Sequence, residues 1–122
     1  MANPNINTAT TVVANNSQAS LTTTSAFQLI SNAASSNKIF LIDSIMIANI
    51  GTSSTNITLA LYQSATNTGT AFELMPSISI PPNSSITIGK NDGLNLLENE
   101  SIYAVASIAN NLKINAFWKE YS

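Results

Sequence analysis

The chain has 122 residues, of which 44% are hydrophobic and only 8% are charged. It contains no histidine and no cysteine, and its four basic residues are all lysine, so it has no arginine either. Because most acid–base and nucleophilic catalysis at neutral pH relies on side chains that are missing here, the composition argues against an enzyme.

The length is that of one domain, long enough to bury a core without disulfide or metal support. The lysines are scattered and could not neutralise a row of phosphates, so we expect no nucleic-acid partner: Lys38, Lys90, Lys113 and Lys119. No stretch approaches the roughly 20 apolar residues that span a bilayer, so we expect no membrane partner. A net charge of −2 leaves little repulsion between copies and permits homo-oligomers.

The first stretch, residues 1–24, differs from the rest of the chain. It has few large apolar side chains, namely Ile6, Val12, Val13 and Leu21. Such a segment buries little surface on its own, so we expect either a weakly structured arm that contacts other subunits or a peripheral first strand. If it is an arm, Ile6, Val12 and Val13 are its candidate contact residues. The domain proper is predicted to span residues 25–122.

From residue 38 onward the hydrophobic pattern has a period of two, which is typical of strands. Residues 38–50 form the longest candidate, predicted to be a central strand that is buried on both faces in its middle. The next candidate strand has Ile57, Leu59 and Leu61 on one face.

The second half of the chain continues the same pattern. Ile78 and Ile80, then Ile86 and Ile88, predict two strands around a proline pair, which cannot donate ladder hydrogen bonds and belongs in a turn or at an edge. Residues 102–108 predict another strand. Residues 94–100 fit either one helical turn or a loop.

The last strand alternates most clearly of all. Its residues Leu112, Ile114, Ala116 and Trp118 alternate with Lys113, Asn115, Phe117 and Lys119. Clusters of Asn, Ser, Thr and Gly at 35–37, 51–54, 66–69 and 91–93 predict turns between strands. Together these elements predict an all-β fold, a single β-sandwich or jelly roll of roughly eight antiparallel strands.

Candidate chemistry is sparse. Glu98 and Glu100 would face the same side of an extended strand, but two carboxylates on one loop fit a soluble sheet end better than a glycosidase dyad. Asp92 fits a turn better than a calcium loop, because no run of oxygen ligands follows it. Ser36 and Lys38 lack the spacing of a Ser–Lys catalytic pair. We therefore predict no catalytic residue, metal site or cofactor, and consider a small-molecule ligand improbable.

The aromatic residues fit contacts better than a sugar platform. Phe117 and Trp118 are adjacent and must point to opposite faces of a strand, so one fills the core and the other lies outside. Tyr62, Phe117 and Tyr121 are the candidate interface residues of the domain, and they are also the candidates if the chain binds glycan.

Several motifs of the chain resemble a known group of proteins. They are the loop at 35–38 followed by the strand at 39–49, the Ile-Pro-Pro-Asn-Ser-Ser turn at 80–85, the Leu-x-Leu-x-x-x-Glu-Ser-Ile segment at 94–102, and the closing strand at 114–121. In the order and type of these motifs, about four-fifths of the chain resembles small virion structural proteins of tailed bacteriophages, especially marine and cyanobacterial phages.

The resemblance implies a non-enzymatic subunit present in many copies, decorating or cementing a phage capsid. Its implied partners are other copies of itself and the phage major capsid protein, and its implied location is the virion, assembled in the host bacterial cytoplasm. A visible secretion signal is lacking, which fits that expectation. The alternative is a tail, neck or fibre module, with host-surface glycan as its target.

Overall fold

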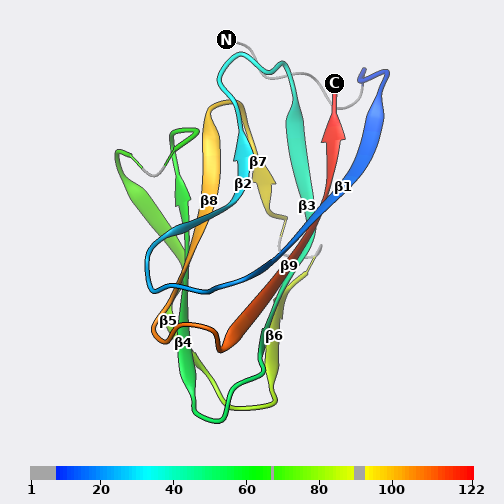
Figure 1. Cartoon of the computed structure of the whole chain (residues 1–122). Helices are drawn as coiled ribbons and strands as arrows, with labels where there is room; N and C mark the ends of the chain where they lie inside the picture. The colour runs from blue at the N-terminus through cyan, green and yellow to red at the C-terminus, as the bar shows by residue number, and fades with distance from the viewer. Residues whose placement is uncertain (1–7, 67, 90–92) are drawn as a thin grey trace.

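A computed structural model describes residues 8–66, 68–89 and 93–122. Within these ranges the chain forms nine strands and no helix, arranged as two antiparallel sheets (Figure 1). The five-stranded sheet contains β1 (Val12–Ser20), β3 (Ile39–Asn49), β6 (Ser85–Ile88), β7 (Asn95–Leu96) and β9 (Leu112–Tyr121). The four-stranded sheet contains β2 (Phe27–Asn32), β4 (Thr55–Tyr62), β5 (Ala71–Ile80) and β8 (Glu100–Ala106). The prediction of an all-β sandwich is confirmed.

The strand pairing identifies the sandwich as a jelly roll. Early strands pair with late ones in reverse order, β1 with β9, β2 with β8, β3 with β6 and β4 with β5. This is the pairing of one long hairpin. The hairpin is rolled into two sheets, since β9 also pairs with β3 and β8 also pairs with β4. Such a roll is a known way for antiparallel strands to enclose a core.

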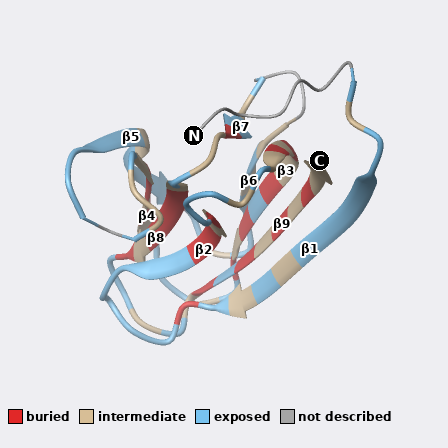
Figure 2. Ribbon diagram, turned by 90° about the horizontal axis from the view of Figure 1, so that it is seen from above, coloured by how far each residue is buried: buried red, intermediate tan, exposed pale blue. Residues whose placement is uncertain are grey.

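The core lies between the sheets and follows the predicted alternation. In β9, Leu112, Ile114 and Ala116 are fully buried, and Trp118 stacks on Phe40 with ring centroids 6.1 Å apart. In Figure 2 the buried positions lie mainly on the inner strands, while β1 and β5 at the sheet edges are mostly exposed. Because successive side chains of a strand point to opposite faces of the sheet, alternate residues fill the core and the residues between them face solvent.

The prediction for residues 38–50 was right about position and wrong about burial. β3 lies between β9 and the pair β6 and β7, as expected of a central strand. Only one of its faces is covered, however, because no described element packs on the outer side of the five-stranded sheet. Ile45 and Ile47 are fully buried, whereas Met46 between them is 42% exposed. A continuous apolar run here reflects one core face and one outward-facing apolar surface.

The predicted turns contain the left-handed residues that such turns need. Positive φ angles occur at Ser35 and Asn37, in the predicted cluster at 35–37, and at Asn83, in the predicted turn at the proline pair. The helical turn considered for residues 94–100 is wrong. Those residues form the two-residue strand β7, then a tight turn with Asn99 at φ 60°, and then the start of β8. Asn tolerates this conformation better than β-branched residues do.

The amino-terminal stretch includes a regular edge strand. β1 pairs with β9 along its whole length, from Val12 opposite Tyr121 to Ser20 opposite Lys113, without a register shift. Beyond β1, Leu21 is buried in the core at 3% exposure. Before it, Thr11 and Ser122 exchange backbone hydrogen bonds of 3.0 and 3.1 Å, so the two ends of the domain lie side by side. Ile6 lies outside the described residues, and the predicted boundary at residue 24 stays a prediction.

Two buried asparagine amides connect the sheets at opposite ends of β3. Asn32 at the end of β2 donates to the backbone oxygens of Lys38 at 2.9 Å and Leu96 at 3.3 Å. Asn49 at the end of β3 donates to the backbone oxygens of Ser53 at 2.9 Å and Ile80 at 2.8 Å, and Gly51 N–H donates to its Oδ1. Buried polar groups are stable only when paired, so each amide fixes the loops around it.

We predict that Asn49→Ala lowers the free energy of unfolding by about 3 kcal/mol, because it leaves the buried backbone oxygen of Ile80 and the part-buried N–H of Gly51 without their partner. Chemical denaturation monitored by tryptophan fluorescence measures this. Asn95→Ala is the matched control, since Asn95 is exposed on β7, and it should change stability little. Equal effects of the two substitutions would contradict this role of Asn49.

Candidate assembly surface

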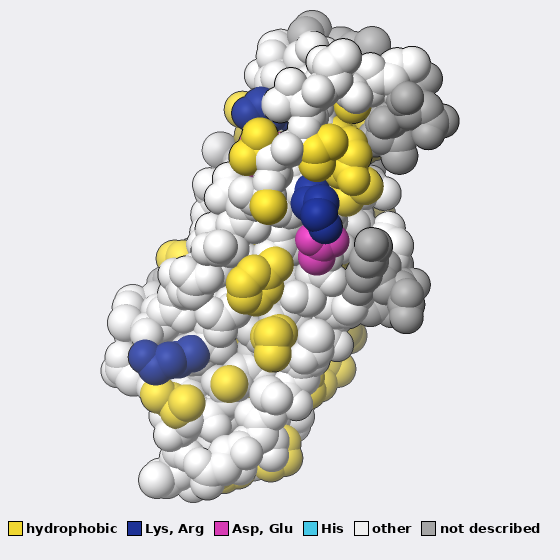
Figure 3. Space-filling model, turned by 90° about the vertical axis from the view of Figure 1, so that its right-hand side faces the viewer, with side chains coloured by type: hydrophobic (Ala, Val, Ile, Leu, Met, Phe, Trp, Pro, Cys, Tyr) yellow, Lys and Arg dark blue, Asp and Glu magenta, His cyan; other side chains and the backbone are white. Residues whose placement is uncertain are grey.

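The outer side of the five-stranded sheet is the most distinctive surface of the molecule. We call it the outer face. It comprises the side chains of β1, β3 and β9 that alternate away from the core, among them Val12, Asn16, Leu41, Met46, Phe117, Lys119 and Tyr121. In Figure 3 this side of the molecule shows separate hydrophobic patches among polar atoms, with one basic side chain against one acidic one. This face therefore exposes both apolar side chains and an ion pair.

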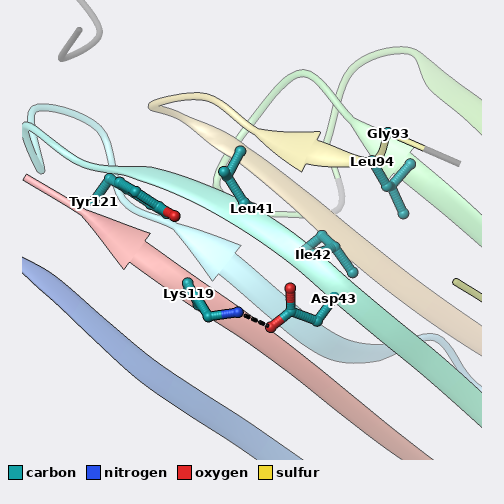
Figure 4. Close-up of a pocket in the computed structure, with 7 residues that line it drawn as sticks. All are labelled: Leu41, Ile42, Asp43, Gly93, Leu94, Lys119 and Tyr121. Carbon is teal, nitrogen blue, oxygen red and sulfur yellow. Dashed lines mark hydrogen bonds and ion pairs between the residues drawn. The ribbon is translucent and has the colours of Figure 1, made fainter. Parts of the chain in front are cut away.

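A β-bulge positions an ion pair on the outer face. The register of β3 against β9 shifts between Ile42 and Ser44, so Asp43 has no partner residue on β9. Its carboxylate reaches Lys119 Nζ at 2.8 Å (Figure 4). The hydrogen bond from the ammonium to Asp43, together with the charge of that carboxylate, raises the pKa of Lys119 above its usual value. The Lys119 ammonium therefore keeps its charge at neutral pH, beside a side chain of opposite sign.

A small hollow lies beside this ion pair. It has a volume of about 180 Å³ and is lined by Leu41, Ile42, Asp43, Gly93, Leu94, Lys119 and Tyr121 (Figure 4). Pockets that enclose drug-sized ligands usually measure some 300 to 1,000 Å³. This hollow falls below that range.

Glu120 is the best-connected carboxylate in the described part of the chain, and it lies on the inward side of β9. It accepts hydrogen bonds from Asn15 at 2.9 Å, Lys38 at 3.1 Å and Trp118 at 3.2 Å. Burial raises the pKa of Glu120, but these three hydrogen bonds and the Lys38 charge together outweigh it, and the net pKa is lowered. Glu120 thus connects β1, the start of β3 and β9 and has a structural role.

The structure places the described interface candidates in three different positions. Val12, Phe117 and Tyr121 share the outer face, with Val12 directly opposite Tyr121 in the register. Val13 alternates to the other side of β1, although it is still 49% exposed. Tyr62 lies on the other sheet, packed edge-to-face against Tyr103 at 5.5 Å. The candidate aromatics therefore do not form one platform.

The side chains that were considered for catalysis have structural partners. Asn37 N–H donates to Glu98 at 2.6 Å, and Leu97 N–H donates to Glu100 at 2.9 Å, so both carboxylates hold loop backbone. Lys38 Nζ is paired with Glu120 rather than with Ser36. Asp92 lies outside the described residues. Among those described, no three His, Cys, Asp or Glu side chains come together in a way that could hold a metal ion.

The described residues also include no helix of the length and apolarity needed to cross a membrane.

Sequence reasoning missed two members of the outer face, Leu41 and Met46. Both alternate with buried residues of β3, and this alternation was the available signal. It was overlooked because the neighbouring positions are apolar too, which made the strand resemble one that is buried on both sides.

Comparison with known proteins supports the fold and leaves the family open. No family model and no curated protein matches this chain. A solved chain from Bacillus endospore appendages, described as a novel family of disulfide-linked pili, matches with a TM-score of 0.54 at 16% identity, covering 92% of this chain and 88% of that one. A chain from the acidic stable capsid of Helicobacter pylori bacteriophage KHP30 matches with a TM-score of 0.55 at 9% identity, covering 93% and 90%. The TM-scores of these two matches establish a shared fold, and their sequence identities are too low to establish a shared family or function.

We predict that Glu120→Gln makes the protein less stable at neutral pH and less sensitive to acid. The folded pKa of Glu120 lies below its ordinary value of 4.5. Its ionised form therefore stabilises the fold above that value, and this stabilisation is lost as the pH falls through the folded pKa. The variant should lose about 1 kcal/mol at neutral pH. It should also show a smaller drop in unfolding free energy on going to about pH 3.

Denaturation curves at neutral and acidic pH measure both effects. Glu73→Gln is the control, because Glu73 is an exposed carboxylate on β5. An acid-induced loss of stability that is unchanged in Glu120→Gln would contradict the prediction.

Proposed function

We propose that this chain is a non-enzymatic structural subunit of a virion, present in many copies and decorating or cementing a phage capsid. The observation that carries the proposal is the likeness to a chain of the bacteriophage KHP30 capsid, which spans nine-tenths of both chains at a TM-score of 0.55. The resemblance of the strand and turn motifs to small phage virion proteins points in the same direction. On this proposal the partners are other copies of itself and the phage major capsid protein, and the assembly takes place in the host bacterial cytoplasm.

The chemistry of the surface supports such a role. Many copies can pack side by side only if they repel each other weakly, and a net charge of −2 gives little repulsion. The outer face offers hydroxyls, amides and isolated apolar side chains. Each contact of this kind is weak, but repetition on a symmetric particle multiplies weak contacts through avidity.

A second candidate is a subunit of an extended structure such as a tail, neck or fibre, including one that binds host-surface glycan. The likeness to a chain of the Bacillus endospore appendages favours this candidate, because those appendages are pili. The pili are disulfide-linked, whereas these 122 residues contain no cysteine. Contacts that these residues make in a fibre would therefore not be disulfides.

Sedimentation with phage heads tests the first candidate. We predict that the purified chain pellets with DNA-free heads of the phage that encodes it, saturating at a fixed ratio to the major capsid protein. Free capsid subunits should not bind it, because a cementing protein recognises the assembled lattice. Binding to host cells or to isolated tails without binding to heads would favour the second candidate, and binding to none of them would overturn both.

Two substitutions locate the contact. We predict that Phe117→Ser on the outer face weakens head binding about tenfold, the loss of roughly 1.4 kcal/mol expected of an interface aromatic. Tyr62→Ser on the other sheet is the matched control and should leave binding unchanged. Thermal melts of both variants check that folding is retained. A loss with Tyr62→Ser alone would assign the contact to the four-stranded sheet.

A further inference from the structure

The edge formed by β1 lacks the features that usually protect an exposed strand. β1 has nine residues, Val12–Ser20, and none of them is charged, proline or glycine. Its register against β9 is unbroken, so no bulge twists it away. Among the described residues no strand pairs with its other side, and Figure 2 shows it along the outside of the sheet. Natural proteins normally protect such edges with charges, prolines, bulges or very short strands.

The other sheet edges of the molecule do carry protection. β5 contains Pro76 and Glu73, has a positive φ at Ser77, and shifts register twice against β4. β6 has only four residues, β7 has two, and both border the same strand, β3. β2 has six residues and a register shift between Gln28 and Ile30. Among the described edge strands, only β1 is long, regular in register and unprotected. The strand that best matches the free edge of β1 is therefore β1 of a second copy.

The backbone groups on the free side of β1 can be identified. Thr11 exchanges hydrogen bonds with Ser122, and Leu21 N–H donates to Leu112, so the odd-numbered residues of this stretch bond to β9. In an antiparallel ladder the bonding direction alternates along the strand. The N–H and C=O groups of Val12, Ala14, Asn16, Gln18 and Ser20 consequently point to the free edge.

These groups are self-complementary about Asn16. In an antiparallel pair of two β1 strands centred on this residue, Val12 of one copy faces Ser20 of its partner and Ala14 faces Gln18. Every edge-facing residue then meets another edge-facing residue, so all the free backbone groups pair. No charge opposes a like charge, because β1 has none. Within a single chain the Asn16 N–H donates to the Asn15 side chain at 3.0 Å, a local bond that the paired strand would replace.

We propose that two copies of this chain pair through β1 in an antiparallel, two-fold arrangement that joins their five-stranded sheets into one. Residues of equal parity meet, so both outer faces lie on the same side of the joined sheet. The pairing is isologous and uses up the edge in both copies, which gives a closed dimer rather than a growing fibril. The proposal is independent of where the dimer is assembled, and it can fail while the virion assignment holds.

Mass in solution tests the pairing. Light scattering of the wild-type chain, from micromolar to millimolar concentration, should give an even multiple of the 12.9 kDa chain mass. Asn16→Pro should halve that mass, because proline removes an N–H that faces the free edge and leaves the ladder to β9 intact. Asn16→Ala keeps the N–H and should retain the wild-type mass. A circular dichroism melt of each variant checks folding.

Cross-linking tests the register directly. Asn16 is placed opposite Asn16 of the partner at a Cα separation of about 5.5 Å, which is within the range a disulfide bridges. With no native cysteine, Asn16→Cys should form a covalent dimer on mild oxidation, and Thr52→Cys in an exposed loop should not. Dimer formation should also be insensitive to salt, because no charges meet.

Three results would overturn the proposal. The first is a wild-type chain that stays monomeric over the whole concentration range. The second is a mass that Asn16→Pro leaves unchanged. The third is a yield of covalent dimer from Asn16→Cys no higher than that from Thr52→Cys.

Discussion

The two buried asparagine amides are the constraint on which the rest of this fold depends. A sandwich of two sheets can slide along its apolar interior, because hydrophobic contact is not directional. Asn32 reaches from the four-stranded sheet to Lys38 and Leu96, and Asn49 reaches from the five-stranded sheet to Ile80. Hydrogen bonds are directional, and a buried amide that lost its partners would be costly. The two amides therefore fix the relative position of the sheets at both ends of β3.

Sequence reasoning succeeded where a local pattern decides the structure. The alternation of Leu112, Ile114, Ala116 and Trp118 with polar neighbours gave both the strand and its inward face, because only the pleat of a strand was needed. It failed for Met46. Whether a second layer covers the outer side of a sheet depends on the whole topology, and an apolar residue on an uncovered face looks the same in the sequence as one in a core.

The candidate surface was predictable only in part. The sequence showed that Phe117 and Trp118 must face opposite sides of their strand, and it did not decide which of the two lies outside. The convergence of Phe117 with Val12 and Tyr121 depends on the register between β1 and β9, which joins residues about a hundred positions apart in the chain. The bulge at Asp43 likewise exists only against β9. Strand register and bulges are set by the pairing of distant strands, and no residue type in this sequence predicts them.

The hydrogen bonds between Thr11 and Ser122 have a practical consequence for the use of this domain as a scaffold. Both ends of the described fold leave from one pole of the sandwich, so a passenger peptide fused to either end would emerge beside that pole. The opposite pole, where the Asn49 amide organises the loops, would stay free of cargo. A circularly permuted chain would need only a short linker across the Thr11–Ser122 junction, with new ends opened in an exposed loop.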